Sequence, residues 1–183
     1  MVEEWRFRKL DLREKPAASR RYHVVVQNTP EWYAHWRARL DFDSVEYGVG
    51  GIQLLQPDEL PRGQVGFAVT SDGKSLVGTA LGDWRSEWLV VGHEIACGDP
   101  IFASQDAPHP VFSAMHGEVF WEPKIIAPSI EVFAPCLRAF QAFAAGRSSP
   151  VEIEANPPTR ERQAQFLSVI RNLTDDNQDA LGF

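Results

Sequence analysis

The sequence predicts an α+β fold in which a mainly antiparallel or mixed β-sheet is packed by helices from both ends of the chain. Apolar residues at helical spacing occur near residues 30–41 and after residue 128, whereas residues 47–121 form short apolar runs separated by Gly, Pro and Asp. The strand–helix alternation typical of a doubly wound parallel sheet is missing. A chain of 183 residues can bury a core of this kind without a metal or disulfide.

The chain divides into three parts on composition. Residues 1–21 are rich in Glu, Arg and Lys and lack the apolar core of a signal peptide, so we expect a charged N-terminal arm. The run Tyr-His-Val-Val-Val at 22–26 predicts a strand. We assign residues 22–146 to one domain. Residues 147–183 are expected to form a linker and a C-terminal helix packed on that domain.

A first helix is expected to begin at Thr29-Pro30-Glu31, with Thr29 as the N-cap and Pro30 in the first turn. It should end near Asp41. Aromatic and aliphatic residues recur along it at helical spacing and are expected to form its buried face: Trp32, Tyr33, Trp36 and Leu40.

The middle of the chain predicts a series of strands. The candidate strands are residues 49–55, 65–70, 76–80, 87–94, 101–103, 111–115 and 118–121. Between two of them, Ser71-Asp72-Gly73-Lys74 indicates a tight hairpin turn, because Asp-Gly tolerates the positive φ angles that such a turn requires.

Two further helices are expected after residue 128. Ser129 is a suitable N-cap, Pro135 should kink the helix, and Gly146 should end it. Its apolar stripe comprises Ile130, Phe133, Leu137, Phe140 and Ala144, and we expect Phe133, Leu137 and Phe140 to be buried against the sheet. Residues 147–158 are interpreted as the linker. Thr159 should start the last helix, whose apolar side comprises Phe166, Leu167, Ile170 and Leu173.

The charge balance restricts the partners that we expect. With 25 acidic and 18 basic residues the formal net charge is −7, which disfavours nucleic acid and favours a basic protein partner. No apolar run is long enough to cross a membrane, so the cytoplasm is the expected compartment. Cys97 and Cys136 stand in unlike contexts and are interpreted as small buried side chains, without a disulfide framework.

One polar cluster has residue types that could carry chemistry. His93, Glu94, Cys97 and His116 could in principle bind a metal, or Cys97 could act as a nucleophile with His116 as its base. Their spacing fits no known zinc motif, and no third orienting group is evident. A structural role in strands and turns is therefore the favoured interpretation. No catalytic residue, metal or cofactor is predicted.

The segment Asp83-Trp84-Arg85 is a candidate partner-binding loop. Trp84 and Trp88 flank an arginine, and Trp and Arg are enriched among the residues that dominate binding energy at protein interfaces. If the loop presents these side chains outward, Asp83, Trp84 and Arg85 form a contact surface. The alternative is that Trp84 covers the protein's own sheet.

Six short motifs, taken in order, resemble the SUKH superfamily, which includes fungal Smi/Knr cell-wall regulators and bacterial toxin-immunity proteins. They are WLVVG at 88–92, GDPIF at 98–102, PVF at 110–112, HG at 116–117, WEP at 121–123 and IAPSIEVF at 126–133. GGIQL at 50–54 and DEL at 58–60 look like the family's earlier glycine-led strand and loop, and with them the resemblance covers about residues 47–143. Its signature residues are interpreted as structural: Gly98 and Pro100 shape a turn in which Asp99 accepts backbone N–H groups, His116-Gly117 forms a second turn, and Trp121 follows it.

The resemblance implies an α+β protein-binding domain without shared catalytic residues. Our leading hypothesis is an immunity protein that neutralises a bacterial toxin, such as a basic nuclease, by direct binding. A regulatory adaptor of a cellular enzyme is the alternative within the binding class. A small metal- or cysteine-dependent hydrolase that uses His93, Cys97 and His116 is the alternative from another class.

Overall fold

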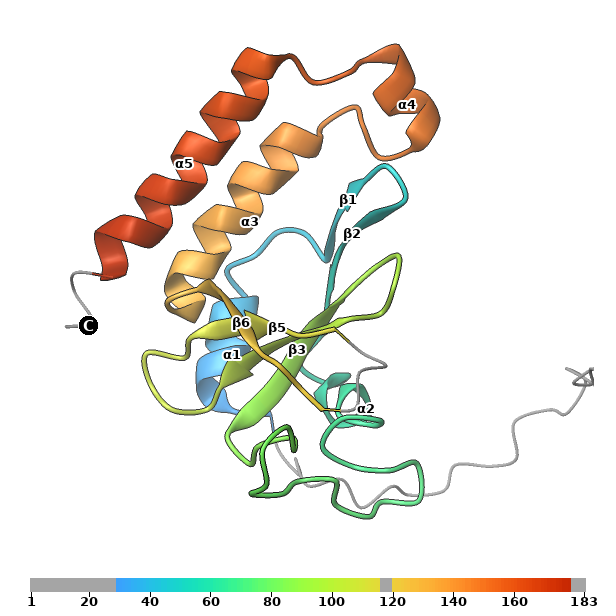
Figure 1. The fold of residues 1–183 in the computed structure, drawn as a ribbon, viewed down its shortest axis with the longest axis vertical. Coiled ribbons are helices and arrows are strands. Elements are labelled where there is room, and N and C mark those ends of the chain that lie inside the picture. The colour runs from blue at the N-terminus through green and yellow to red at the C-terminus, as the bar shows by residue number, and fades with distance from the viewer. Residues whose placement is uncertain (1–28, 116–119, 179–183) are drawn as a thin grey trace, which may run out of the picture.

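A six-stranded antiparallel sheet organises the computed structural model, which describes residues 29–115 and 120–178 (Figure 1). The expected arm at 1–21 and strand at 22–26 lie outside the described residues. The strands lie in the sheet in chain order: β1 (Ser44–Tyr47), β2 (Gly50–Leu54), β3 (Trp88–Glu94), β4 (Pro100–Ser104), β5 (Val111–Ser113) and β6 (Lys124–Ala127). Every neighbouring pair is antiparallel, so the predicted α+β class is confirmed.

The two faces of the sheet bury separate apolar clusters, because successive side chains of a strand point to opposite faces. On β3, Leu89 and Val91 pack with α1 (Glu31–Arg37) and α3 (Ile130–Ala144). Val90, between them, belongs to the cluster on the other face. Irregular chain between α2 (Leu60–Gly63) and β3 contributes to that second cluster.

The first helix begins one residue later than the sequence predicts. Pro30 occupies the N-cap position, and the Thr29 hydroxyl donates to the carbonyl of Pro57 (2.5 Å) instead of capping the helix. Tyr33 and Trp36 are buried as expected, whereas Trp32 is half-buried. The Tyr33 hydroxyl lies 2.5 Å from the Leu55 carbonyl oxygen, and burial raises its pKa above the usual value.

Four predicted strands match β2, β3, β4 and β5, but the predictions at 65–70 and 76–80 are wrong. These segments form only isolated bridges, such as Val77 with Trp84, and their apolar residues cover the sheet rather than extend it. The turn at 71–74 is present, with Gly73 at φ 84°. At 118–121, Phe120 and Trp121 lie outside any strand, and β6 begins instead at Lys124.

Buried Gln64 fills the place of a strand next to β3. Its side-chain carbonyl accepts from the Val90 N–H (3.0 Å), and its side-chain amide donates to the Val90 carbonyl (3.0 Å) and the Leu60 carbonyl (3.0 Å). Neighbouring strand β2 ends where Leu54 pairs with Gly92, so Val90 has no backbone partner on that side. The amide of Gln64 thus satisfies two buried backbone groups that would otherwise lack partners.

Helix α3 follows the sequence prediction closely. The Ser129 hydroxyl accepts from the Val132 N–H (3.2 Å), Pro135 lies inside the helix, and Gly146 adopts a positive φ just after it. Phe133 and Leu137 are buried against the sheet as expected. The expectation for Phe140 is wrong: it is half-buried, with its ring 6.3 Å from Tyr47 of β1 and 6.1 Å from Phe166 of the last helix.

This position of Phe140 predicts a moderate loss of stability on truncation. Phe140→Ala should lower the free energy of unfolding by about 2 kcal/mol, because a half-buried ring gives up less contact than an enclosed one. Phe133→Ala, on the same helix but 3% exposed, should lower it by about 3–5 kcal/mol. Urea denaturation of both variants checks this. Equal losses would mean that Phe140 is enclosed.

The expected linker at 147–158 contains a short helix, α4 (Pro150–Ala155). Ser149 and Glu152 form a reciprocal capping box at its start. Buried Arg147 joins the end of α3 to the end of α4. Its guanidinium donates to the carbonyls of Phe143, Ala145 and Asn156 and to the Asn156 side chain.

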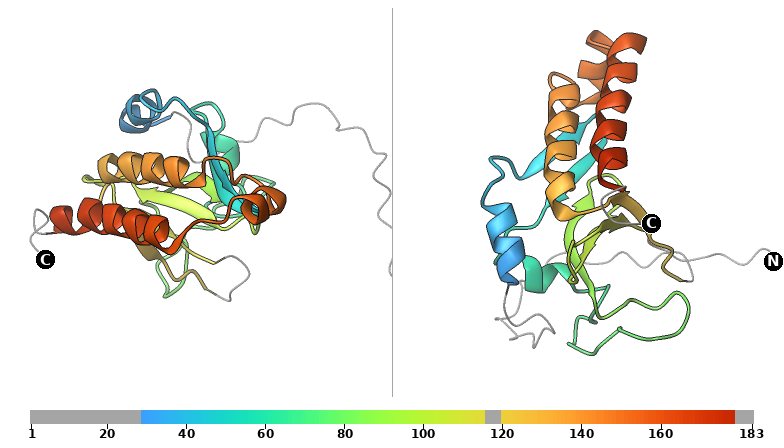
Figure 2. Two further views of the ribbon diagram at one scale, coloured as in Figure 1. Left: turned by 90° about the horizontal axis from the view of Figure 1, so that it is seen from above. Right: turned by 90° about the vertical axis from the view of Figure 1, so that its left-hand side faces the viewer.

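The last helix, α5 (Arg160–Gln178), lies alongside α3 (Figures 1 and 2). The Thr159 hydroxyl accepts from the Arg162 N–H (3.2 Å), as its predicted capping role requires. Phe166 stacks on Phe143 of α3 (4.7 Å between ring centroids), whereas Leu167 is exposed. Within residues 29–115 and 120–178, no helix has the length and apolar character needed to cross a membrane.

Candidate functional site

The turn between β3 and β4 contains the signature residues Gly98, Asp99 and Pro100. Gly98 adopts φ 77°, a left-handed conformation that favours glycine, and Pro100 opens β4. The carboxylate of Glu94 accepts from the backbone N–H groups of Gly51 (3.1 Å) and Cys97 (2.7 Å). The sequence predicts only that Asp99 accepts backbone N–H groups in this turn. In the structure Glu94 ties this turn to the neighbouring strand β2.

This turn does not favour a cysteine nucleophile. Cys97 is exposed, contrary to the prediction that both cysteines are buried, while Cys136 is buried. A hydrogen bond to Glu94 is the main cause that raises the pKa of the Cys97 thiol to about 11. A nucleophilic cysteine requires the opposite shift, towards thiolate at neutral pH.

The described members of the polar cluster do not form a metal site. His93 is half-buried on β3 next to Phe67 (5.9 Å between ring centroids), and burial lowers its pKa. His116 and Gly117 lie outside the described residues. In the part of the chain that the structure describes, no group of three or more His, Cys, Asp or Glu side chains could hold a metal ion.

Of the two alternatives that the sequence leaves open for Trp84, the structure shows the one in which it covers the protein's own sheet. Trp84 is 1% exposed and occupies the middle of the second core cluster. Its ring lies 4.8–5.4 Å from four other rings, those of Phe67, Trp88, Phe102 and Trp121. The large area of an indole is better buried against an otherwise uncovered sheet face than left in water. Signature residue Trp121 therefore packs on Trp84.

The two neighbours of Trp84 also serve the fold. Asp83 accepts from the Ala80 N–H (2.8 Å) through its carboxylate, and Arg85 donates to the Gly78 carbonyl (3.2 Å). Both side chains close the irregular segment that carries Trp84. The three residues proposed from sequence as a contact surface thus hold one buried tryptophan in place.

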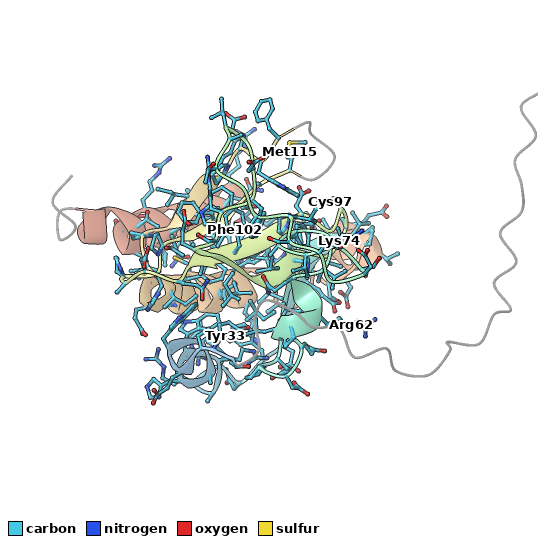
Figure 3. All side chains as sticks on the ribbon, turned by 90° about the horizontal axis from the view of Figure 1, so that it is seen from below. Tyr33, Arg62, Lys74, Cys97, Phe102 and Met115 are labelled. Carbon is cyan, nitrogen blue, oxygen red and sulfur yellow. The ribbon has the colours of Figure 1, made fainter. Side chains whose placement is uncertain are left out.

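A different surface has the properties of a contact site. Four apolar side chains near the start of β6 remain exposed, and we call them the apolar patch: Leu81, Met115, Phe120 and Ile125. Leu81 is 94% exposed and Ile125 66% exposed. Met115 lies on the opposite side of the sheet from Tyr33 of α1 (Figure 3).

Specific contacts bring Leu81, Met115 and Phe120 of the apolar patch together. The carbonyl of Gly82, the residue after Leu81, accepts from the Trp121 N–H (2.8 Å). Gly82 also lies so close to Phe120 that a Cβ on Gly82 would collide with the Cβ of Phe120. Met115 and Phe120 line the same surface hollow of about 290 Å³. Ile125 pairs with Phe112 across β5 and β6.

Strand β6 adds a second property to this surface. It is the last strand of the sheet, and among residues 29–115 and 120–178 no strand pairs with its outer edge. Unpaired N–H and C=O groups at such an edge can bind another extended chain. Pro123 lacks an N–H group just before β6, which limits pairing to the four residues Lys124–Ala127.

The apolar patch is not predicted from the sequence, because residues 118–121 have the pattern of a buried strand. In a strand, Phe120 and Trp121 would point to opposite faces of the sheet, and each could be buried on its own face. The run Phe120-Trp121 followed by Ile125-Ile126 was the only available signal, since it places more apolar residues near β6 than one short strand can bury.

Comparison with protein-family models, curated proteins and solved structures found no match for this chain.

Proposed function

We propose that this chain is a non-catalytic protein-binding domain of the SUKH type, and specifically an immunity protein that neutralises a basic bacterial toxin by direct contact. The apolar patch is the observation that supports it most. Contiguous exposed apolar surface is uncommon on a protein that acts alone, and patches of this kind are frequent at protein interfaces. Phe120, an aromatic side chain that is 51% exposed, is a suitable anchor.

The charge of the chain supports a basic partner. Residues 1–28 contain seven of the 18 basic and four of the 25 acidic residues, which leaves 11 basic and 21 acidic residues in the rest. A domain with this excess of negative charge attracts a basic protein from a distance and speeds its association. The environment of Cys97 gives no support to the alternative of a cysteine-dependent hydrolase.

Affinity capture from the source organism is the direct test of the partner. Tagged full-length chain is used as bait in cytoplasmic extract, the compartment that the sequence predicts, and bound proteins are identified by mass spectrometry. We expect a basic toxin whose activity stops when the chain is added at equal concentration. Recovery of a housekeeping enzyme whose activity is modulated would favour a regulatory adaptor instead.

Substitutions in the apolar patch should weaken binding of the captured partner. Phe120→Ala is expected to raise Kd about tenfold or more, mainly through faster dissociation. Leu81→Ser should act in the same direction at little cost to folding, because Leu81 is almost fully exposed. Val151→Ser on α4, also exposed, is the matched control and should leave Kd unchanged.

Surface plasmon resonance with thermal melts of each variant provides the measurement. The melts separate lost affinity from lost folding. Unchanged Kd for both Phe120→Ala and Leu81→Ser would place the partner elsewhere on the chain. Association that does not slow as salt is raised would contradict the charge argument, because screening weakens attraction between surface charges.

A further inference from the structure

We infer that the outer edge of β1 binds an extended, basic segment of the protein partner as an added strand. This inference rests on the proposed function and deepens it, because it gives the basic partner a second contact besides the apolar patch. Strand β1 ends the sheet on the side opposite β6, and within residues 29–115 and 120–178 no strand pairs with its outer side. Backbone groups at such an edge can bond to another extended chain.

The register of β1 determines which of its backbone groups face outward. The Leu54 N–H donates to the Asp43 carbonyl (2.8 Å), and in an antiparallel pair the residues that bond to the neighbouring strand alternate with residues that do not. Asp43 and Val45 therefore bond towards β2. The N–H and C=O groups of Ser44 and Glu46 point to the outer side, where no described residue bonds to them.

A hydrogen bond just after the strand agrees with this direction. Gly48 follows Glu46 by two residues, so its N–H should also point outward, and it donates to the carbonyl of Arg147 (2.8 Å). The turn after β1 thus lies beside the chain that joins α3 to α4 (Figure 1). That chain enters α4 at Pro150 and bonds to this edge at Gly48 alone among the described residues. The rest of the edge remains available to another segment.

A shallow groove lies beside the available part of the edge. Its volume is about 270 Å³, with β1 on one side and the end of α3 and the residues after it on the other. Three residues on the α3 side are small: Ala144, Ala145 and Gly146. An extended chain next to β1 therefore has room for its own side chains on this face.

The alternation of β1 specifies the side chains of the added strand. Val45 is buried, and the Tyr47 ring lies 5.5 Å from the Phe143 ring of α3, so these two β1 side chains point to the α3 face. Glu46, between them, is exposed on the other face. A residue opposite Glu46 shares its face and should be basic, whereas the next residues along should be small and apolar and contact the end of α3.

The charges near this edge favour a basic occupant. Asp41 and Asp43, just before β1, already form ion pairs with Arg138 and Arg37. Glu46 has no ion-pair partner in the part of the chain that the structure describes. A Lys or Arg of an added strand would supply that partner, and opposite charges facing each other across two strands are stabilising.

Amide exchange, followed by NMR on the full-length chain, tests the inference with a defined probe. The probe is a heptapeptide of alternating Lys and Val, capped at both ends. In the free chain the N–H groups of Ser44 and Glu46 should exchange quickly and that of Val45 slowly, because only Val45 bonds to β2. We expect the peptide to slow exchange at Ser44 and Glu46 about tenfold and to leave exchange in β6 unchanged.

Two matched peptides separate backbone pairing from charge. The first has backbone N-methyl groups on its lysine residues, which removes the N–H groups that would bond to β1. The second has Glu in place of Lys and brings like charge to Glu46. Each should bind at least about tenfold more weakly, measured from the NMR shifts of Ser44 and Glu46. Equal binding of the N-methylated and unmodified peptides would overturn the inference.

Two substitutions at Glu46 test the same geometry from the protein side. Glu46→Pro removes an N–H that makes no bond in the fold, so an edge strand tolerates it, and it should raise the Kd of the Lys/Val peptide about tenfold or more. Glu46→Ala keeps the N–H and should raise Kd only about threefold. Thermal melts and slow exchange at Val45 check folding. A folded Glu46→Pro protein with parental Kd would overturn the inference, and if this variant does not fold, the N-methylated peptide decides.

Other occupants of the edge give different results. Protection of Ser44 and Glu46 in the free chain would overturn the inference. If that protection grows with protein concentration, a second copy occupies the edge. If it does not, another segment of the same chain occupies it.

The peptide experiment does not involve the apolar patch, so failure of the inference and failure of the proposed function can be distinguished. If the peptide protects Ser44 and Glu46 while Phe120→Ala and Leu81→Ser leave partner affinity unchanged, the inference stands and the apolar patch is not the partner's contact. If the patch variants weaken partner binding while the peptide leaves exchange at Ser44 and Glu46 unchanged, only the inference fails.

Discussion

Replacing Trp84 with alanine is expected to lower the free energy of unfolding by about 3–5 kcal/mol, the range for a fully buried large aromatic side chain. The loss arises because the cavity would lie at the centre of the second cluster, where the indole contacts four other rings. The irregular segment that carries Trp84 has little regular backbone bonding of its own. We therefore expect it to separate from the sheet when the indole is removed.

Chemical denaturation of Trp84→Ala and Trp84→Phe tests this expectation. Phenylalanine keeps most of the apolar contact and loses the hydrogen bond from the indole N–H to the Trp88 carbonyl (3.3 Å), so it should cost less. Arg85→Ala serves as the neighbouring control and should change stability by less than either variant. A Trp84→Ala protein of unchanged stability but weakened partner binding would restore Trp84 as an exposed anchor.

Replacing Gln64 with alanine is expected to lower the free energy of unfolding by about 3–4 kcal/mol. The substitution removes three hydrogen bonds at once and leaves the N–H and the carbonyl of Val90 without partners in the core. Each buried polar group left without a partner costs about 1–3 kcal/mol. An alanine side chain also leaves a gap beneath α2.

A matched control exists on the adjacent strand. Gln53 is an exposed glutamine whose side-chain amide donates to the carbonyls of Asp43 and Leu54, and water can replace those acceptors. Gln53→Ala should therefore change stability by no more than about 0.5 kcal/mol. Gln64→Glu should remain destabilised, because a carboxylate cannot donate to the two carbonyls. Denaturation midpoints that are equal for Gln53→Ala and Gln64→Ala would contradict this role.

Local chemistry made the helices predictable. The Ser129 hydroxyl caps α3 and the Thr159 hydroxyl caps α5, each a bond between residues three apart in the chain. The apolar spacing of Phe133 and Leu137 indicates a buried helix face because one helical turn brings such positions together. Even so, the capping Ser149 and Glu152 were present in the sequence and were overlooked, since the short segment was interpreted as a linker.

The irregular segment before β3 could not be derived in the same way. Val69 and Val77 have the apolar character of strand residues, and the sequence offers no reason to prefer bridges over a ladder. Tertiary contacts decide the outcome: the side chains of Val77 and Trp84 pack in the cluster on the sheet face opposite α1 and α3, and Val69 is fully buried. An apolar run predicts that its side chains are buried, but the backbone conformation depends on the surface against which they pack.

By itself, the sequence determined the α+β class, the positions of α1, α3 and α5, and four of the six strands, because capping, turn formation and apolar spacing act between residues close in the chain. Only the tertiary structure decided that Trp84 is buried, that Gln64 replaces a strand beside Val90, and that Phe120 remains exposed. Those outcomes depend on residues from distant segments meeting at one place. The exposure of a side chain is set by what packs on it, and local spacing contains no information about that neighbour.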